Sequence, residues 1–386
     1  MIGSLTDLWK REKLTVAGLM SGTSMDGVDV AITELSGSGT DTKWEVKYSN
    51  SYPFESSLRE QIQNSIEGGA ETVCRLNFDL GKEFSASLGT ALAESGIPPS
   101  ELDLIGSHGQ TIYHVDGHSS LQVGEASVLA EAFGVPVVSD FRVRDIAAGG
   151  SGAPLVPYVD HLLFGKDGGR LLLNIGGIAN FTAIPSPCNS LDDINAWDTG
   201  PANMLMDLAA ESISNGAQMY DKDGKFATAG KVNSSWLSDL MAHPYVSKPP
   251  PKSTGREDFG EDYFNSLLEK FEINSETGKL DLIATLTRFS AESIKFNFDE
   301  YVKKKDGITE VIVSGGGTAN PVLMGHLGSL FSSIKVNKID EYGIDSGAKE
   351  AVAFAILANE FIAGTASNVP KVTGASKRVL LGKLTI

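Results

Sequence analysis

Three clusters of glycine, each placed directly after a short apolar run, constrain this chain more than any other feature of its sequence. The runs cover residues 14–20, 170–175 and 310–313, and the glycines that follow them are Gly22, Gly27, Gly176, Gly177, Gly315, Gly316 and Gly317. Glycine lets backbone N–H groups approach an anion and point at it, because no Cβ stands in the way. Strand ends are also where α/β proteins bind ligands. The clusters therefore predict turns that hold phosphate, with tight hairpin turns that bind nothing as the alternative.

Predicted strands and helices alternate along the chain, which favours an α/β architecture with mixed sheets. The strand 14–20, a glycine turn and a strand over 28–35 form a predicted hairpin, and residues 170–184 repeat this pattern in the second half. Further strands are expected over 102–105, 135–138 and 310–313, and helices over 56–67, 73–95, 203–213, 280–298 and 346–362. The repeated hairpin predicts two similar domains with a cleft between them.

A glycine-rich stretch, Ala147–Pro154, marks a domain boundary or hinge. We expect a first domain of residues 1–145 plus 367–386 and a second domain of residues 146–366. No stretch approaches the roughly 18 consecutive apolar residues of a membrane span. The two cysteines, Cys74 and Cys188, cannot form a disulfide framework, which favours a cytoplasmic setting without membrane contact.

The chain is acidic, with 49 acidic against 32 basic side chains and a net charge of −17. Binding to nucleic acid needs a basic surface, so a nucleic-acid partner is not expected. An anionic small substrate remains compatible with this charge, because a local basic pocket can form in an acidic protein.

Asp198 is the strongest candidate for a catalytic base. It follows the apolar pair Ala196-Trp197 and precedes a Gly-Pro turn, so it is expected at the end of a strand, just before a helix. A carboxylate at such a strand end, close to a cleft between domains, can take a proton from an attacking oxygen. A capping or solvent-exposed aspartate is the alternative.

Arg142, Arg144 and Arg256 stand out because basic residues are scarce here, and Arg142 and Arg144 lie two residues apart. If the segment is extended, their spacing of two places them on one side of it, where they could bind a carboxylate or a phosphoryl group. Internal pairing with Asp140 and Asp145 is an equally good interpretation. Glu350 lies on an otherwise apolar helix and would be a metal or sugar ligand if it faced inward, although a surface position is the default.

The signatures of other nucleotide enzymes and hydrolases are missing. The sequence has no P-loop motif, no dinucleotide fingerprint and no serine nucleophile elbow. A zinc site formed by His108, His114 and His118 is disfavoured, because Asp116-Gly117, between the last two, is expected to form a turn. His108 and Gln110, in Ser107-His108-Gly109-Gln110-Thr111 after the strand 102–105, are better candidates for hydrogen bonds to a substrate.

The ordered set of motifs resembles the anhydro-N-acetylmuramic acid kinase family. The matching blocks are Gly22-Thr23-Ser24-Met25-Asp26-Gly27-Val28-Asp29, Ser107-His108-Gly109-Gln110-Thr111, Asp140-Phe141-Arg142, Gly152-Ala153-Pro154-Leu155, Asn174-Ile175-Gly176-Gly177, Asp198-Thr199-Gly200-Pro201, Lys252-Ser253-Thr254-Gly255-Arg256-Glu257 and Gly315-Gly316-Gly317. Any one block is weak, but the ordered set spans nearly the whole chain and is specific.

The resemblance implies a two-domain actin-like fold, with ATP and Mg²⁺ as cofactors and a small anhydro sugar as substrate. In this family, water attacks the anomeric carbon of 1,6-anhydro-N-acetylmuramic acid and opens the anhydro ring. The oxygen released at C6 takes the γ-phosphoryl group, which gives N-acetylmuramic acid 6-phosphate in cell-wall sugar recycling. A homodimer is compatible with this reading.

The resemblance also implies roles for individual residues. Asp198 would activate the water. The nucleotide would contact Gly22, Thr23, Ser24, Met25, Asp26, Gly27, Val28, Asp29, Gly176, Gly177, Gly315, Gly316, Gly317 and Asn320. The substrate would contact His108, Gln110, Arg142, Arg144, Asn203 and Glu350, and the metal would be held by Asp26 and Glu350.

Two alternatives and one departure accompany this interpretation. Levoglucosan kinase shares many of the same blocks, but Arg144 and the tail Val372-Thr373-Gly374-Ala375 look more like the muramyl enzymes. A non-catalytic actin-like nucleotide-binding protein would be favoured by a missing base, whereas Asp198 is present. The family usually reads D-T-G-P-G-N, and Ala202 replaces the second glycine here, which could tighten the pocket without removing the base.

Overall fold

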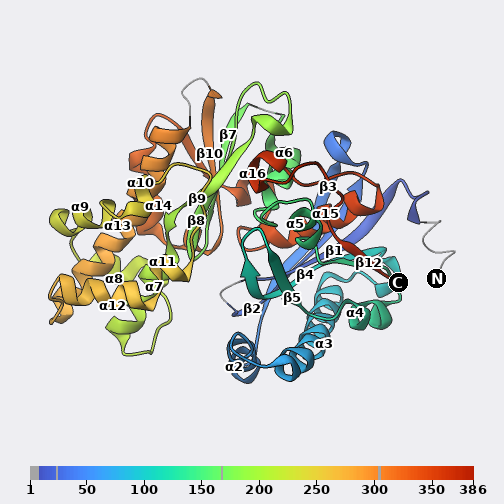
Figure 1. The fold of residues 1–386 in the computed structure, drawn as a ribbon, viewed down its shortest axis with the longest axis horizontal. Coiled ribbons are helices and arrows are strands. Elements are labelled where there is room, and N and C mark those ends of the chain that lie inside the picture. Colours follow the sequence, from blue (N-terminus) through green and yellow to red (C-terminus); the bar gives the residue numbers. More distant parts are fainter. Residues whose placement is uncertain (1–7, 23–24, 167, 303–305) are drawn as a thin grey trace. The chain divides into compact units, whose positions relative to one another are not determined.

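The computed structural model describes residues 8–22, 25–166, 168–302 and 306–386. Contacts within the chain divide it into two compact units, each with its own sheet (Figure 1). The first unit is Met1–Leu163 together with Gly343–Ile386, and the second unit is Phe164–Tyr342.

The first unit is built on a sheet whose strands come from both of its segments. Its elements are β1 (Lys13–Ser21), β2 (Gly27–Ser36), η1 (Gly39–Asp41), β3 (Lys43–Pro53), α2 (Ser56–Ser65), α3 (Ala70–Ser95), η2 (Pro99–Glu101), β4 (Leu104–Val115), β5 (Ser119–Val123), α4 (Ala126–Phe133), β6 (Val137–Ser139), α5 (Val143–Ala147), α6 (Val156–Phe164), α15 (Lys349–Ile362), α16 (Pro370–Thr373) and β12 (Lys383–Thr385).

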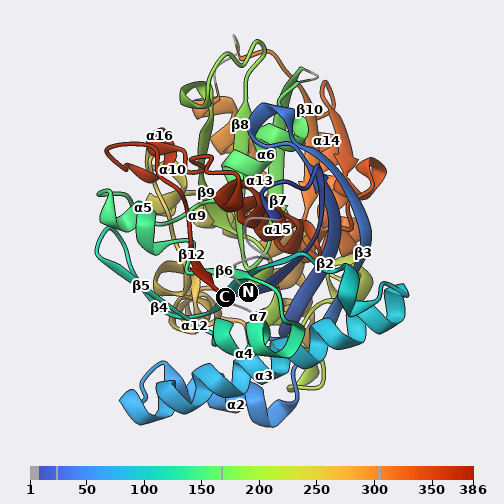
Figure 2. The ribbon, with the colours of Figure 1, turned by 90° about the vertical axis from the view of Figure 1, so that its right-hand side faces the viewer.

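The strand order of this sheet is β12-β6-β4-β1-β2-β3, and β5 pairs with β4. Strands β1, β4 and β6 are parallel, and β2 runs antiparallel to both β1 and β3. Helix α3 packs on one face through Leu80, Phe84 and Leu88, and α15 lies on the other face (Figure 2). Because both faces are covered, β1 is buried along nearly its whole length, as expected for a central strand with parallel pairing.

Helix α15 approaches the sheet unusually closely at two glycines. A Cβ built on Gly18 of β1 would lie 1.9 Å from the carbonyl oxygen of Ala351, and one on Gly106 of β4 would lie 2.2 Å from that of Phe354. The helix presents small residues to this surface, among them Ala355 and Ala358. The absence of side chains at these glycines therefore sets the distance between helix and sheet.

The second unit repeats the plan with different helices. Its elements are β7 (Gly169–Ile175), β8 (Ile178–Ile184), η3 (Leu191–Asp193), β9 (Asn195–Pro201), α7 (Asn203–Ser214), η4 (Lys222–Gly224), α8 (Lys225–Ala229), α9 (Ser234–Met241), α10 (Pro244–Ser247), α11 (Arg256–Phe259), α12 (Glu261–Lys270), α13 (Glu276–Tyr301), β10 (Ile308–Ser314), η6 (Gly316–Ala319), α14 (Pro321–Leu330), β11 (Lys335–Lys338) and η7 (Ile339–Tyr342).

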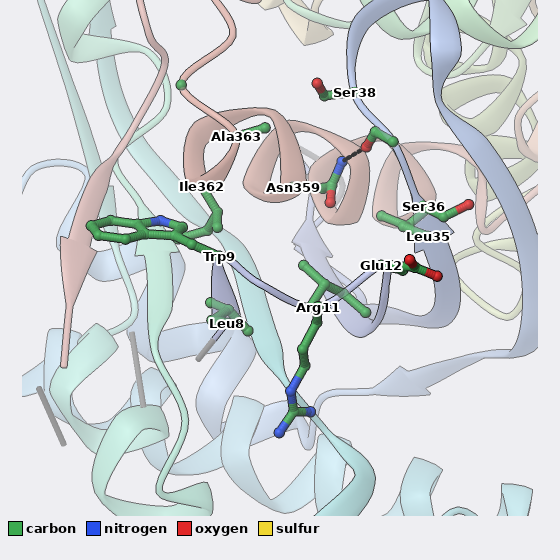
Figure 3. A pocket seen from close by; sticks show the side chains of 13 residues that line it. Leu8, Trp9, Arg11, Glu12, Leu35, Ser36, Ser38, Asn359, Ile362 and Ala363 are labelled. Atoms are coloured by element: carbon green, nitrogen blue, oxygen red, sulfur yellow. Dashed lines mark hydrogen bonds between the residues drawn. The ribbon is translucent and has the colours of Figure 1, made fainter. Parts of the chain in front are cut away.

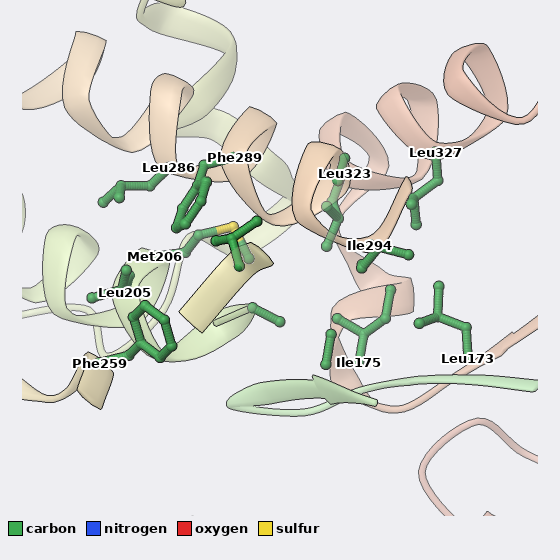
Figure 4. Packing of buried hydrophobic residues seen from close by; sticks show 14 of the residues in the cluster. Leu173, Ile175, Leu205, Met206, Phe259, Leu286, Phe289, Ile294, Leu323 and Leu327 are labelled. Atoms are coloured by element: carbon green, nitrogen blue, oxygen red, sulfur yellow. The ribbon is translucent and has the colours of Figure 1, made fainter. Parts of the chain in front are cut away.

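The second sheet has the order β11-β10-β7-β8-β9. As in the first unit, the first strand pairs antiparallel with the second and parallel with the fourth, and the second pairs antiparallel with the third. Leu173 and Ile175 of β7 point into an apolar core that Phe289 and Ile294 of α13 help to fill (Figure 4). The two units thus share one strand order, which confirms the predicted α/β class with mixed sheets and the repeated hairpin.

The chain passes from the first unit to the second between residues 163 and 164 and returns between residues 342 and 343. The sequence predicted these boundaries at 145/146 and 366/367. The difference has a packing reason. Helix α15, expected in the second domain, contacts β1, β2 and β4 and so belongs to the first unit. Within the second unit, Arg170 lies over the rings of Phe164 and Tyr342, its first and last residues, and also pairs with Glu310 at 3.0 Å.

No helix in the part of the chain that the structure describes is long and apolar enough to cross a membrane. Cys74 and Cys188 do not form a disulfide; Cys74 is exposed, and the Sγ of Cys188 donates to the carbonyl oxygen of Ser190 at 3.4 Å.

We expect Gly106→Ala to destabilise the protein by roughly 2–3 kcal/mol, because the added methyl group would collide with the backbone of α15. Urea unfolding measures this effect. Gly89→Ala is the matched control, because nothing lies within 4 Å of a Cβ at this position in α3, and alanine is favoured over glycine within a helix by about 0.5–1 kcal/mol. Equal midpoints for Gly106→Ala and the wild type would contradict the close packing of α15.

Candidate active site

The first glycine turn joins β1 to β2 and is held by side chains from the sheet. The Oγ of Ser21 lies 2.6 Å from Oε1 of Gln110 and 2.8 Å from the carbonyl oxygen of Gly27. Gln110 also donates through Nε2 to the carbonyl oxygen of Gly22 at 3.1 Å. Gln110 is fully buried, so the structure places this predicted substrate residue beneath the turn, as a brace for it.

The other predicted nucleotide-binding residues of this turn differ in how far their side chains are buried. Val28 is buried in the core, and Met25, at φ 57°, packs against the same core, so any contact from these two to a nucleotide would come largely from the backbone. Asp26 is exposed and Asp29 is half-buried. Thr23 and Ser24 lie outside the described residues.

Arg142 and Arg144 do not lie on an extended segment, so that prediction is wrong. Arg142 has helical dihedral angles and directly precedes α5, which contains Arg144. The helical turn separates the two side chains, and Arg144 is exposed. Arg142 instead donates through Nε to Nε2 of His108 at 3.1 Å and through Nη1 to the carbonyl oxygen of Gly152 at 3.0 Å.

The predicted pairing partners of these arginines are engaged elsewhere. Asp140 pairs with Lys383 at 2.9 Å. Asp145 is fully buried and accepts hydrogen bonds from the Gly152 amide, from Asn368 and from Thr373. These bonds hold Gly152 and the glycine-rich stretch around it in place. The carbonyl oxygen of Gly152 accepts the hydrogen bond from Arg142.

Glu350 lies in the first turn of α15, among charged groups of both signs. Burial raises its pKa, while the charges of Lys349 and Arg142 lower it. Burial also raises the pKa of Asp29, to about 6. A hydrogen bond from Ser51 lowers this pKa, whereas the negative charges of Glu350, Asp26 and Asp345 raise it. Hence α15 brings Glu350 close to the first glycine turn and to Arg142.

In the second unit, the two remaining glycine clusters meet. A Cβ on Gly317 would lie 2.2 Å from Cγ2 of Ile175 and 3.1 Å from Oδ1 of Asn203, and one on Gly315 would lie 2.6 Å from the carbonyl oxygen of Ile175. Gly315 also has φ +88°, which favours glycine. The end of β10 therefore rests directly on the end of β7, beside the start of α7.

The turn between β7 and β8 is braced by backbone groups. The carbonyl oxygen of Gly176 accepts from the Asn203 amide, and that of Gly177 accepts from the amides of Ala202 and Met204. The side chain of Asn203 donates to the Ile175 carbonyl oxygen at 3.3 Å, while Asn320 caps α14 by accepting from Val322 and Leu323. Six of the predicted residues are thus brought to one place: Gly176, Gly177, Asn203, Gly315, Gly316 and Gly317.

Gly176 and Gly316 differ from their neighbours in having room above them. A Cβ on Gly316 would find its nearest atom at 3.8 Å, and one on Gly176 at 3.5 Å, which are ordinary contacts. Packing within the protein therefore does not require glycine at these two positions. Glycine backbone with room for a further atom, beside a helix N-terminus, is the kind of site that phosphate groups occupy, so the residues present fit a nucleotide.

Asp198 lies in β9 and is held by the segment 245–258, which we call the strap. The amide of Thr254 donates to Oδ2 of Asp198 at 3.0 Å, and the hydroxyl of Tyr245 donates to the Asp198 carbonyl oxygen at 2.9 Å. The Asp198 amide donates to the carbonyl oxygen of Lys252. Thr254 in turn donates to Asp258 at 2.7 Å, which fixes the strap itself.

The opposite side of β9 is held by polar residues of α13. Ser293 and Asn297 both donate to the carbonyl oxygen of Thr199, at 2.7 and 3.0 Å, and Asn297 accepts from the indole of Trp197 at 3.1 Å. These side chains are fully buried, and each satisfies a backbone or indole group that would otherwise lack a partner. Asp198 is therefore fixed from two directions.

Burial raises the pKa of Asp198 to about 6. The hydrogen bond from the Thr254 amide and the charge of Lys252 lower it, whereas Glu257 raises it. Lys252 does not contact the carboxylate through a hydrogen bond; its ammonium donates to the carbonyl oxygens of Tyr245 and Val246 and lies 4.7 Å from the centre of the Tyr245 ring. A carboxyl that is half protonated near pH 6 can act as a base at neutral pH.

The sequence indicated no role for the strap residues that contact Asp198, which are Tyr245, Lys252 and Thr254. Lys252 and Thr254 belong to a recognised motif block, but nothing local to that block indicates a contact with a residue 50 positions earlier. Tyr245 carries no signal at all. Ala202, the departure from the family pattern, lies wholly in the apolar core, so its methyl group contacts core residues.

A surface hollow of about 430 Å³ lies elsewhere, at the opposite end of β1 and β2 from the glycine turn. It is lined by Trp9, Leu35 and Ile362 among others, and Asn359 donates to the carbonyl oxygen of Gly37 beside it (Figure 3). None of the predicted site residues lines this hollow.

The shared strand order, with glycine turns at the ends of β1, β7 and β10, defines the class: this is an actin-like fold of the sugar kinase type. The family model for anhydro-N-acetylmuramic acid kinase matches residues 14–386, and the chain belongs to that family.

Similar proteins carry the same name. An anhydro-N-acetylmuramic acid kinase of Caldanaerobacter subterraneus subsp. tengcongensis is 40% identical over 395 residues and covers 99% of each chain. One of Clostridioides difficile is 43% identical over 378 residues, covering 95% of this chain and 97% of the relative. Among solved structures, a ROK family glucokinase from Streptomyces griseus matches at 10% identity over 90% of this chain and 99% of its own, with a TM-score of 0.39, too low for any conclusion to rest on it.

We expect Gly316→Ala and Gly317→Ala to fail in different ways. Gly316→Ala should leave the urea midpoint near that of the wild type, because its methyl group makes only ordinary contacts. It should weaken nucleotide binding about tenfold or more, because the methyl group would occupy the position above the glycine where we expect phosphate. Gly317→Ala should lower the unfolding free energy by roughly 2 kcal/mol, since its methyl group meets Ile175. Calorimetric titration with ADP, beside urea unfolding, separates the two. Unchanged ADP affinity in a folded Gly316→Ala protein would exclude this position from the nucleotide site.

We expect Asp198→Asn to stabilise the protein at high pH. The folded-state pKa of Asp198 lies near 6, above the ordinary value of 3.8, so the folded chain binds more protons than the unfolded chain between these pH values. The wild type therefore loses stability as pH rises from about 4 to 6, and asparagine escapes this loss. Urea unfolding should show a gain on the order of 2 kcal/mol at pH 8 and none at pH 4.

The exposed Asp116→Asn is the control for this effect, because Asp116 lies in a turn on the surface. Its unfolding free energy at both pH values measures the effect of removing a surface carboxyl. A gain for Asp198→Asn that is equal at pH 4 and pH 8 would show that the effect does not come from ionisation.

Proposed function

We propose that the protein opens the anhydro ring of 1,6-anhydro-N-acetylmuramic acid with water and phosphorylates O6 with ATP. The product is N-acetylmuramic acid 6-phosphate, as expected for recycling of cell-wall sugars. Membership of the family supports this reaction. The observation in the structure that carries the proposal is Asp198, a carboxylate with a raised pKa that is fixed by the strap and by α13.

The reaction balances with one base. Asp198 takes a proton from water while the water oxygen forms a bond to C1 of the sugar. The C1–O6 bond breaks, and O6 bonds to the γ-phosphorus as the bond from that phosphorus to the bridging oxygen of ADP breaks. Positioning and charge stabilisation supply most of the catalysis in phosphoryl transfer.

We assign the nucleotide to the glycine turns. In the first unit these are the residues from Gly22 to Asp29, and in the second unit Gly176, Gly177 and Gly315–Gly317, with Asn320 supporting them as the cap of α14. The room above Gly176 and Gly316, where a Cβ would make only ordinary contacts, supports this assignment.

The substrate is assigned to groups that present charge or hydrogen-bond donors. Arg142 and Arg144 would meet an anion, either the lactyl carboxylate or the transferred phosphoryl group, and Asn203 and Glu350 would contact the sugar or the phosphates. Arg142 has the stronger support, because two hydrogen bonds hold its guanidinium in place.

Mg²⁺ would neutralise phosphate charge when bound, and Asp26 and Glu350 are its proposed protein ligands. Carboxylate oxygens are the ligands Mg²⁺ prefers, and Glu350, Asp26 and Asp345 are each close enough to Asp29 to raise its pKa. No group of three His, Cys, Asp or Glu side chains within the described ranges is arranged to hold a metal ion. The ion would therefore take most of its ligands from phosphate and water, as Mg²⁺ commonly does.

Levoglucosan kinase and a non-catalytic nucleotide-binding protein are not favoured, because the matching family and its relatives are named for the muramyl sugar. We place the reaction in the cytoplasm, where ATP is available and the two cysteines stay reduced. A homodimer stays a prediction, which light scattering on the purified protein would decide.

The purified protein should release ADP with 1,6-anhydro-N-acetylmuramic acid at least ten times more efficiently than with levoglucosan, and not with N-acetylmuramic acid, which has no anhydro ring to open. Product detection by phosphorus NMR would identify the 6-phosphate. Preference for levoglucosan would replace the proposed substrate, and no ADP release with either anhydro sugar would overturn the proposed activity.

Asp198→Asn should lower kcat by roughly 100-fold or more, since general base catalysis typically contributes 10²–10⁴-fold. In the wild type, kcat should fall as pH decreases through about 6, because protonation removes the base. Chromatographic measurement of ADP avoids coupling enzymes, which have pH profiles of their own. Full activity of Asp198→Asn, or a flat wild-type profile between pH 5 and 8, would exclude Asp198 as the base.

A further inference from the structure

His108 lies beneath Arg142 and is almost completely buried. Only 3% of it is exposed, and its ring lies 4.6 Å, centre to centre, from the ring of Phe354 on α15. Gly106, two residues earlier in β4, lets the helix approach closely enough for this contact. The imidazole is thus fixed by packing and cannot reach a substrate without displacing its neighbours.

Both ring nitrogens of His108 are already engaged within the protein. Nδ1 lies 2.8 Å from the carbonyl oxygen of Gly109, and because a carbonyl can only accept, Nδ1 carries the proton. Nε2 is then the acceptor of the neutral ring, and Nε of Arg142 donates to it at 3.1 Å. Burial and the charge of Arg142 lower the pKa of His108 to about 3, which agrees with a neutral ring.

Arg142 has a second fixed contact on another edge of its guanidinium. Nη1 donates to the carbonyl oxygen of Gly152 at 3.0 Å, and the Gly152 amide donates to the buried Asp145 at 2.9 Å. Because a guanidinium is planar and rigid, contacts at two of its nitrogens set the direction of the remaining N–H groups. His108 is one of these two supports.

We propose that His108 is a positioning residue, which orients the guanidinium of Arg142 toward an anionic group of the substrate and does not itself contact the substrate. This inference rests on the proposed function, in which Arg142 binds an anion. It changes the role expected for His108 from the sequence. It also explains why a histidine stands here, since only a neutral ring with its proton on Nδ1 can serve Gly109 and Arg142 together.

Two substitutions separate orientation from simple packing. His108→Gln can place an acceptor oxygen near the former Nε2, whereas His108→Asn can keep a donor near the former Nδ1 but is too short to accept from Arg142. We expect His108→Asn to lower kcat/KM for the anhydro sugar about tenfold, the effect of losing one hydrogen bond to a charged group, and His108→Gln to recover most of that loss. The kcat/KM of Arg142→Lys, which lacks the planar guanidinium, is measured beside them as the reference for losing its oriented donors.

Urea unfolding of each variant checks stability. Losses of kcat/KM that are equal for the two His108 variants and follow their stabilities would overturn the proposal, because a purely structural histidine behaves in that way. Wild-type kinetics for His108→Asn beside impaired Arg142→Lys would also overturn it. Normal activity of Arg142→Lys and Arg142→Ala would instead remove Arg142 from the proposed function.

A second measurement needs neither a variant nor activity. Nitrogen-15 NMR of histidine-labelled protein reports which ring nitrogen carries the proton. We expect His108 to be neutral, with its proton on Nδ1, from pH 5 to 8. A proton on Nε2, or a ring that gains charge within this range, would overturn the proposal whatever reaction the protein catalyses.

Discussion

Helix α15 can lie on the first sheet only because β1 and β4 each have a glycine beneath it. The carbonyl oxygens of Ala351 and Phe354 come so close that a methyl group at Gly18 or Gly106 would overlap them. This approach places Phe354 against His108 and brings Glu350, at the start of the helix, near Arg142 and Asp29. The placement of Glu350 near Arg142 and Asp29 therefore depends on two missing side chains.

In the second unit, the carboxylate of Asp198 lies on an edge strand and is supported by other segments. Strand β9 pairs only with β8, so its outer side would lack partners without help from the strap. The strap supplies the amide of Thr254 and the hydroxyl of Tyr245, and α13 supplies Ser293 and Asn297 from its buried face. Burial raises the pKa of Asp198 and the rigid support fixes its direction, and both properties suit a base.

The sequence predicted the elements that carry strong local signals. The apolar periodicity of the helix expected over 73–95 agrees with α3, and the hairpins around both glycine turns formed as expected. It failed where distant contacts decide. The arginines at 142 and 144 follow a helical turn because α5 begins there, and α15 joins the first unit because its small residues fit the glycines of β1 and β4. The burial of His108 and Gln110 could not be read from their polar neighbours.

The two sheets share one strand order, yet they brace their first turns by different means. Side chains of Ser21 and Gln110 hold the turn after β1, while backbone amides of α7 hold the turn after β7. Helix α15 returns to the first unit from the far end of the chain, so residues 1–163 alone lack the helix that covers one face of their sheet.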